Sequence, residues 1–178
     1  MIIKILAALV CVVIMVIVTV MIKSKQEETQ RMYTAAERMI QNDILDNSLK
    51  NPFIKGTVIE EEPERQLMLN VKVSKSGKKQ NFVFNPAKVV NIGRERTRNQ
   101  ITINEAVVSN FHCKIYLLQN DTAVVEDCNS SNGTVLKRGM KSYVIANGQN
   151  AVLEDGDKLI IGTVELKIKL FYYDTIWM

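Results

Sequence analysis

The hydrophobic and polar positions divide the chain into three parts, of which the first is the most distinct. Residues 2–22 form an apolar run, IIKILAALVCVVIMVIVTVMI, with one charged residue, Lys4, near its start. Roughly 21 residues at about 1.5 Å each span the hydrocarbon core of a bilayer, which is about 30 Å thick. The run therefore predicts a transmembrane helix at residues 1–22. A cleaved signal peptide is the competing interpretation, but its apolar region has about 7 to 15 residues, and the run ends without a small-x-small cleavage site.

The second part, residues 23–52, is polar and rich in good helix formers, and it contains neither Gly nor Pro before Pro52. Its apolar residues roughly follow helical spacing, so the pattern predicts a helical linker that continues out of the membrane and ends at Asn51–Pro52. Two interpretations of this apolar stripe stay open, a dimerising stalk and an exposed spacer. The stripe consists of Met32, Ala36, Met39, Ile40 and Ile44.

The third part, residues 53–178, consists of short runs of strand-forming residues separated by turn residues. The turn signals include SKSGKK, Asn120–Asp121, Asn147–Gly148 and Asp155–Gly156. Eleven such runs in one small domain predict an all-β, eleven-stranded antiparallel β-sandwich, with binding residues on loops at one end. The runs are GTVIE, QLMLNVKV, NFVF, KVVNI, ITI, CKIYLL, TAVVED, GTVLK, SYVIA, DKLII and VELKIKL.

Basic residues near the apolar run predict the orientation of the chain. One basic residue, Lys4, lies at the N-terminal end of the run, whereas four basic residues follow the run, and basic residues favour the cytoplasmic side. We therefore expect a single-pass protein of the cell membrane whose C-terminal domain is cytoplasmic. The four residues are Lys23, Lys25, Arg31 and Arg38.

Charge and cysteine content add little to this picture. The net charge of +4 favours anionic partners in general. Three cysteines, Cys11, Cys113 and Cys128, match no metal-ligand spacing, so we interpret them as reduced packing residues and expect neither a metal nor a cofactor. No basic helix with base-reading residues and no aromatic platform indicates nucleic-acid binding.

The stretch VSNFHC places Ser109 and Asn110 next to His112, the one histidine of the chain. A serine beside a histidine suggests a nucleophile and a base, but that chemistry also needs an orienting acid and an oxyanion hole. The sequence contains no recognisable third group. We therefore do not expect an enzyme.

Four motifs together resemble a forkhead-associated (FHA) domain, in order and in spacing. The resemblance covers about residues 65–172, a normal domain size. It implies an eleven-stranded β-sandwich whose end loops bind phosphothreonine in an extended peptide. The motifs are Gly93-Arg94, Ser109-Asn110-x-His112, Ser131-Asn132-Gly133-Thr134 and Leu153-x-x-Gly156-Asp157.

The resemblance also implies roles for individual residues. Arg94 would pair with the phosphate, the Ser109 hydroxyl would donate a hydrogen bond, and Asn110 would contact phosphate or peptide backbone. Ser131 would face the phosphate or the threonine methyl, and Asn132 would hold the main chain of the peptide. Such convergent donors suit a phosphate, which carries about −1.5 to −2 charges and three acceptor oxygens.

Further residues are expected to support these loops. Gly93 and Gly133 would be permissive backbone positions. His112 would brace the loops, with direct ligand contact or pH sensing as the alternatives. A basic collar around the site, or simply a set of solvated charges, would come from Arg96, Arg98, Lys137, Arg138 and Lys141.

The sequence therefore predicts a membrane-anchored adaptor that binds threonine-phosphorylated proteins, the substrates of a Ser/Thr protein kinase, and recruits them to the cytoplasmic membrane face. A homodimer through the linker is a further expectation. The alternative is a structural scaffold that uses the same fold without phosphate, within a membrane-associated assembly.

Overall fold

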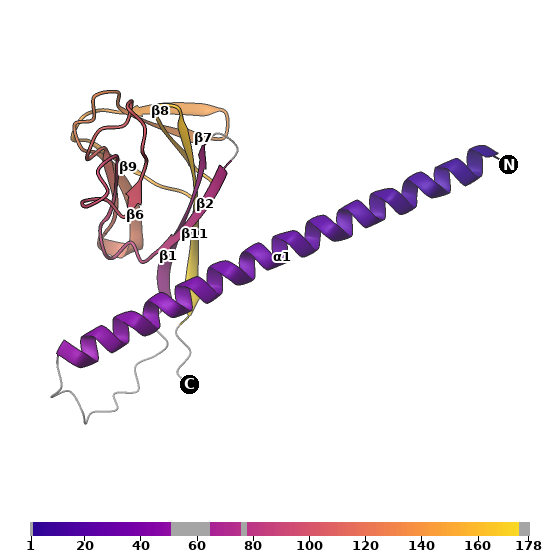
Figure 1. The fold of residues 1–178 in the computed structure, drawn as a ribbon, viewed down its shortest axis with the longest axis horizontal. Coiled ribbons are helices and arrows are strands. Elements are labelled where there is room, and N and C mark those ends of the chain that lie inside the picture. Colours follow the sequence, from indigo (N-terminus) through magenta and orange to yellow (C-terminus); the bar gives the residue numbers. More distant parts are fainter. Residues whose placement is uncertain (1, 51–64, 76–77, 175–178) are drawn as a thin grey trace.

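A long helix precedes a β-sandwich in the computed structural model, which describes residues 2–50, 65–75 and 78–174 (Figure 1). Helix α1 (Ile2–Lys50) covers both the apolar run and the polar linker. The two helices predicted for these segments therefore form one continuous helix. The strands are β1 (Arg65–Lys75), β2 (Lys78–Phe84), β3 (Val90–Gly93), β4 (Ile101–Thr102), β5 (Cys113–Leu118), β6 (Thr122–Asp127), β7 (Thr134–Arg138), β8 (Lys141–Ile145), β9 (Asn150–Val152), β10 (Lys158–Ile161) and β11 (Val164–Asp174).

The eleven strands form two sheets. The six-stranded sheet has the order β2-β1-β11-β10-β7-β8, and the five-stranded sheet has the order β4-β3-β5-β6-β9. The predicted sandwich is thus confirmed, but the prediction of a wholly antiparallel arrangement is wrong, because β3 and β4 pair in parallel. The loop 94–100 brings the chain back along β3 so that Ile101 lies opposite Ile92. Because β4 has only two residues, the chain has to come back by only about the length of two residues.

One predicted strand lies outside the described residues, and one observed strand was not predicted. The run GTVIE lies outside the described residues. Strand β9 was not predicted, because its three residues, Asn150 to Val152, are too few to show an alternation of apolar and polar positions. It pairs with the end of β6 and completes the five-stranded sheet.

The core lies between the two sheets, where alternate residues of the strands point inward. Ile92 and Ile115 come from the five-stranded sheet, and Leu69, Leu159 and Leu166 come from the six-stranded sheet; all five are fully buried. Strand β1 departs from simple alternation, because residues 67–71 are buried without interruption. The outer face of β1 is therefore also covered.

Helix α1 provides this cover. Met32 and Ala36 pack against Met68 of β1 and Phe171 of β11, and the ring of Tyr33 meets the ring of Phe171 edge-on with 5.5 Å between centroids. These contacts show that the stripe is not simply an exposed spacer, because its first two residues, Met32 and Ala36, are buried against the domain of the same chain. A homodimer through these residues would require the helix to leave the sheet.

Two ion pairs flank this apolar contact. Lys72 Nζ lies 2.8 Å from Glu28 Oε1, and Lys88 Nζ lies 2.5 Å from Asp43 Oδ1. Exposed ion pairs contribute at most about 1 kcal/mol each, so the apolar contact holds the helix and the ion pairs fix its direction.

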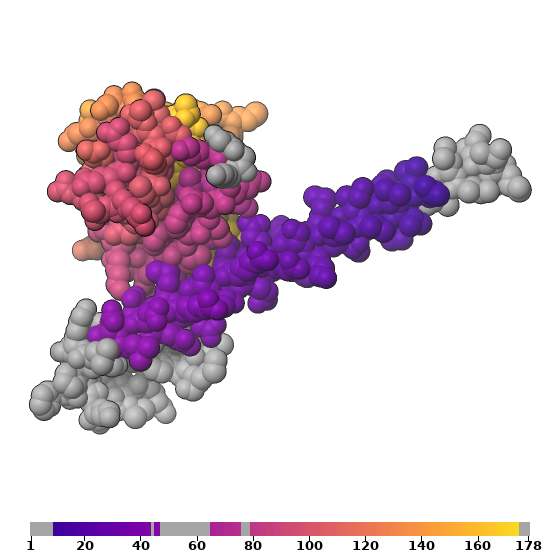
Figure 2. Space-filling view, viewed as in Figure 1, coloured from indigo at the N-terminus to yellow at the C-terminus, as the bar shows by residue number. Residues whose placement is uncertain are grey.

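The N-terminal half of α1 extends away from the sandwich (Figure 2). From Leu9 to Ile22 its large apolar side chains are exposed, and the helix is long and apolar enough to cross a membrane. A soluble domain rarely exposes such a continuous apolar surface. The helix therefore joins an apolar segment of membrane-spanning length to a docked polar segment.

The cysteines differ in their surroundings. Burial raises the pKa of the Cys113 thiol far above its ordinary range, and burial is also the main cause that raises the pKa of Cys128 to about 11. Both are free thiols that stay protonated at neutral pH, which fits packing residues. Cys11, by contrast, is exposed on the apolar part of α1.

We predict that Ala36→Asp releases the helix from the sheet. Ala36 is fully buried, and a carboxylate placed there has no basic partner in the apolar contact described above. Amide hydrogen exchange of the full chain in detergent micelles should become at least about tenfold faster over residues 28–43. Thr34→Asp adds the same charge at an exposed position of the same helix and should leave the exchange rates unchanged. Equal rates in both variants would show that the helix is not held at Ala36.

Candidate functional site

Three loops of the five-stranded sheet and its neighbours meet at one end of the sandwich: 94–100, 103–112 and 128–133. The first two are joined by backbone hydrogen bonds from Arg94 N–H to Ser109 O (2.9 Å) and from Glu95 N–H to Asn110 O (3.2 Å). The second and third are joined by hydrogen bonds from Ser131 N–H to Ser109 Oγ (3.0 Å) and from Asn132 Nδ2 to Val107 O (2.7 Å). Residues separated by up to 25 positions are thereby fixed side by side.

Gly93 allows the first two loops to approach each other. A Cβ atom at this position would lie 2.4 Å from the carbonyl oxygen of Asn110 and 2.9 Å from Asn99 Oδ1, both far inside contact distance. The glycine is required by close packing of backbone on backbone. Gly133, in contrast, has open space around it but a φ of +72°, which favours glycine for its conformation.

Arg94 presents a guanidinium that is oriented but not neutralised. Its Nε and Nη2 atoms both donate to Asn110 Oδ1, at 3.3 and 3.1 Å. Of the five N–H donors of a guanidinium, three remain free, and the side chain is exposed. Within the described part of the chain, no carboxylate lies within 4 Å of it. The geometry is that of a cation held ready for an anion.

Ser109 and Ser131 place two hydroxyl groups 3.5 Å apart. This separation is at the outer limit of a hydrogen bond, so neither hydroxyl proton is strongly engaged. Ser109 Oγ already accepts the Ser131 N–H, which fixes the position of the oxygen. Both hydroxyl protons can therefore turn toward a ligand.

Two asparagines that were expected to contact a ligand also form hydrogen bonds to other residues of the loops. Asn110, for which the family resemblance implies contact with phosphate or peptide, holds the Arg94 guanidinium through its oxygen. Asn132, expected to hold the main chain of a peptide, donates to Val107 O. Its amide oxygen has no partner among the described residues and remains available to accept a hydrogen bond.

His112 is completely buried and joins two of the loops. Its Nδ1 accepts the backbone N–H of Ser109 at 3.1 Å, and its Nε2 lies 3.2 Å from Gly133 O. Accepting at Nδ1 and donating at Nε2 requires the neutral Nε2–H tautomer. Burial lowers the pKa of His112, although the Gly133 carbonyl and Asp127 favour the charged form. A ring in this position contacts loop backbone and not solvent.

Asp127, at the end of β6, is a supporting residue that the sequence analysis missed. It is fully buried, and it accepts hydrogen bonds from Ser130 N–H (2.8 Å), Ser130 Oγ (2.7 Å) and Thr134 Oγ1 (2.6 Å). Burial alone would raise its pKa, but these hydrogen bonds outweigh burial, and the pKa is lowered. The spacing of Asp127 and Ser130 is typical of a side chain that caps a turn, and this signal was available in the sequence.

Asn99 is a second supporting residue that the sequence analysis missed. Its Nδ2 donates to Glu95 O at 2.6 Å and to Asn110 O at 2.7 Å, so it ties the Arg94 loop to its neighbour. Nothing in the local sequence NIGRERTRN distinguishes this asparagine from an ordinary turn residue. Only the fold brings it against Asn110.

The predicted basic collar is wrong for one of its members. The Arg138 guanidinium binds the buried carboxylate of Asp157 through two hydrogen bonds of 2.9 and 2.8 Å, and it also pairs with Glu154. Asp157 belongs to the fourth motif, which therefore fixes the β9–β10 turn and lies outside the three loops. Arg96 and Arg98 are exposed on the Arg94 loop.

Comparisons with known proteins agree with this architecture. The family model of the FHA domain matches residues 90–162. The MEK1 FHA domain aligns with a TM-score of 0.50 and 20% identity over 58% of this chain and 89% of its own. An FHA domain of an Arabidopsis thaliana hypothetical protein gives 0.49 and 24% identity, over 69% of this chain and 99% of its own.

The MEK1 FHA domain in complex with the HOP1 pThr318 peptide also matches, with a TM-score of 0.44 and 18% identity over 56% of this chain and 94% of its own. The comparison with curated proteins gives no match. The chain carries an FHA domain, preceded by a helix that is long and apolar enough to cross a membrane.

We predict that the domain loses stability as the pH falls from 7 to 5. Because folding lowers the pKa of His112, the unfolded chain binds this proton more readily than the folded chain below the ordinary value of 6.5. The free energy of unfolding should therefore decrease toward pH 5, by at most about 1.4 kcal/mol per pH unit for one proton. Asp127, whose pKa is lowered from 3.8, stays ionised throughout this range.

Chemical denaturation of the full chain in detergent micelles measures this dependence. His112→Gln keeps a polar side chain but cannot take up the proton, so its stability should be lower at pH 7 and nearly constant down to pH 5. The same slope in both proteins would assign the acid sensitivity to another group.

Proposed function

We propose that the FHA domain binds threonine-phosphorylated protein, and that the helix holds this adaptor at the membrane. In this proposal residues 1–22 are the transmembrane anchor, residues 23–52 the helical linker and residues 53–178 the FHA domain. The observation that carries it is the oriented, unneutralised guanidinium of Arg94, on a loop that is hydrogen-bonded to the loop of Ser109, which is in turn hydrogen-bonded to the loop of Ser131.

The ligand class follows from the charges and donors of the three loops. The guanidinium offers three free N–H groups, and the two serines offer hydroxyl protons, so a doubly charged phosphate would receive several charge-assisted hydrogen bonds. Asn110 would act by orienting Arg94. Asn132 would form hydrogen bonds with the main chain of the peptide, as acceptor or as donor. His112, Gly93 and Gly133 would support the loops without touching the ligand.

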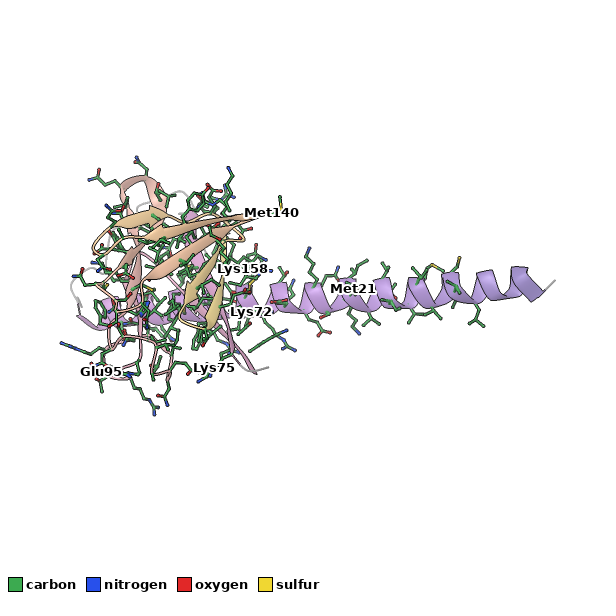
Figure 3. All side chains as sticks on the ribbon, turned by 90° about the horizontal axis from the view of Figure 1, so that it is seen from above. Met21, Lys72, Lys75, Glu95, Met140 and Lys158 are labelled. Carbon is green, nitrogen blue, oxygen red and sulfur yellow. The ribbon has the colours of Figure 1, made fainter. Side chains whose placement is uncertain are left out.

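The position of the loops suits recruitment of a soluble partner. Figure 3 shows Glu95, the neighbour of Arg94, at the end of the domain opposite to the side from which the apolar half of α1 extends. A protein in the aqueous phase would therefore reach the loops without obstruction by the membrane. The orientation of basic residues favours the cytoplasmic face, where a Ser/Thr protein kinase would phosphorylate the partner.

We predict that Arg94→Ala weakens phosphopeptide binding about tenfold to a hundredfold, because a hydrogen bond to a charged group contributes about 1.5 to 3 kcal/mol. The probe is a degenerate library of threonine-phosphorylated peptides with its unphosphorylated counterpart, followed by fluorescence anisotropy with the selected peptides. The protein is the full chain in detergent micelles. Arg96→Ala, which removes an exposed arginine of the same loop, should cost at most a few-fold.

Two outcomes would contradict this proposal. If the wild-type protein selected phosphorylated and unphosphorylated peptides equally, the domain would not recognise phosphate. If Arg94→Ala and Arg96→Ala bound as tightly as the wild type, the scaffold alternative, which holds its partner without phosphate, would be favoured.

A further inference from the structure

A second group of basic residues lies far from the three loops, between helix α1 and the outer face of the six-stranded sheet. It surrounds a cavity of about 200 Å³. The helix contributes one lysine and the sheet contributes three, and a single carboxylate accompanies them. The cavity is lined by Lys25, Glu28, Thr29, Met32, Asn70, Lys72, Lys167 and Lys169.

The strand register concentrates this charge. Lys72 of β1 lies directly opposite Lys167 of β11, and Lys167 in turn lies opposite Lys158 of β10. Lys158 lies opposite Lys137 of β7, so four lysines form one row across four neighbouring strands. Like charges at opposed positions of a sheet repel each other, and such an arrangement is favoured when an anion neutralises it.

The counter-charges within the chain do not balance the lysines. Glu28 pairs with Lys72, and Glu165 pairs with Lys158. In the part of the chain that the structure describes, no carboxylate lies within 4 Å of Lys25, Lys167 or Lys169. The hydrogen bond from Lys72 lowers the pKa of Glu28, as do the charges of Lys169 and Lys167, so this carboxylate stays ionised and still leaves the cavity with an excess of positive charge.

Asn70 gives an independent indication of a ligand. Its side chain is only 4% exposed, it lines the cavity, and its Nδ2 has no hydrogen-bond partner among the described residues. A buried donor without an acceptor is unfavourable and uncommon in native structures. An apolar residue would be expected at this position, since its neighbour on the same face, Met68, packs against the helix. Because this nitrogen is itself inaccessible to solvent, the amide group would have to rotate for it to meet an acceptor in the cavity.

The place of the cavity along α1 indicates where that acceptor comes from. Lys25 follows the end of the apolar run at Ile22 within one turn of helix, at the level where lipid headgroups surround a membrane-spanning segment. Figure 3 shows Lys72 and Lys158 on the side of the domain from which the apolar half of α1 extends. Met140, a fully exposed apolar residue of the β7–β8 turn, lies on the same side.

We propose that this cavity binds the phosphate of an anionic phospholipid headgroup. The phosphate oxygens would accept hydrogen bonds from the ammonium groups of Lys167, Lys169 and Lys25, and from the Asn70 amide once it has rotated toward the cavity. The volume is below the roughly 300 to 1,000 Å³ of sites for small organic ligands, which fits a headgroup and not an extended peptide. The bound lipid would lock α1 against the sheet and set the height of the domain above the membrane.

The proposal rests on the membrane anchoring proposed above and is independent of phosphothreonine binding. Native mass spectrometry of the full chain, released from detergent micelles, tests it directly. The probes are phosphatidylglycerol and phosphatidylcholine with the same acyl chains, and inorganic phosphate as a competitor. The protein should retain one phosphatidylglycerol molecule at least about tenfold more strongly than phosphatidylcholine, and millimolar phosphate should not displace it.

Three variants identify the site. Lys167→Gln with Lys169→Gln should weaken phosphatidylglycerol retention by about tenfold to thirtyfold, because each lysine near a headgroup contributes about a fivefold effect. Lys79→Gln with Lys141→Gln removes the same charge from exposed positions outside the cavity and should change retention by less than threefold. Asn70→Leu removes no charge and should still weaken retention several-fold, which diffuse attraction to a basic surface would not produce.

Several results would overturn the proposal. These are equal retention of the two lipids, equal losses in the two lysine double variants, wild-type retention in Asn70→Leu, or displacement by phosphate, which would indicate a site for a free anion. Alkaline carbonate extraction of membranes tests the anchoring separately. Arg94→Ala should leave lipid retention unchanged, so failure of phosphopeptide binding and failure of this proposal are distinguishable.

Discussion

The buried imidazole of His112 is the interaction on which the candidate site depends. It accepts a hydrogen bond from the backbone of Ser109 and donates one to Gly133, so it holds two loops that have no sheet pairing of their own. The buried carboxylate of Asp127 accepts hydrogen bonds from Ser130 and Thr134 and so fixes the third loop. Buried residues therefore hold the loops, so that the exposed Arg94 and Ser131 and the half-buried Ser109 stay positioned for an anion.

Docking of helix α1 gives the domain a defined relation to its N-terminal segment. The contact of Met32 and Ala36 with Met68 and Phe171 makes the linker part of the folded domain. A domain on a free tether would present its loops in every direction, whereas a docked helix keeps them at the end away from the apolar segment. The same contact creates the lysine-lined cavity, and Figure 3 shows Lys72 of this cavity at the end of the domain opposite to Glu95 of the Arg94 loop.

Much of this structure was predictable from the sequence. The apolar run predicted the helix, short runs of strand-forming residues between turn signals, such as QLMLNVKV, predicted the strands, and four short motifs indicated the FHA resemblance. The docking of α1 was not predictable, because a stripe containing Met32 and Ala36 has the same pattern whether it packs on a partner helix or on a sheet. Asn99 and the row of opposed lysines were missed since they depend on loop packing and strand register, which a single chain pattern does not encode.

In the proposed function, Arg94 itself binds the phosphate of a phosphothreonine. The most direct measurement follows the side-chain Nε–H resonance of Arg94 in the full chain, in micelles, during titration with a library-selected phosphothreonine peptide and with its unphosphorylated form. If Arg94 binds the phosphate, this resonance should shift saturably with the phosphorylated peptide alone, at the same concentration at which the backbone resonance of Ser131 shifts. A phosphorylated peptide that binds while the Arg94 resonance stays in place would contradict this role of Arg94.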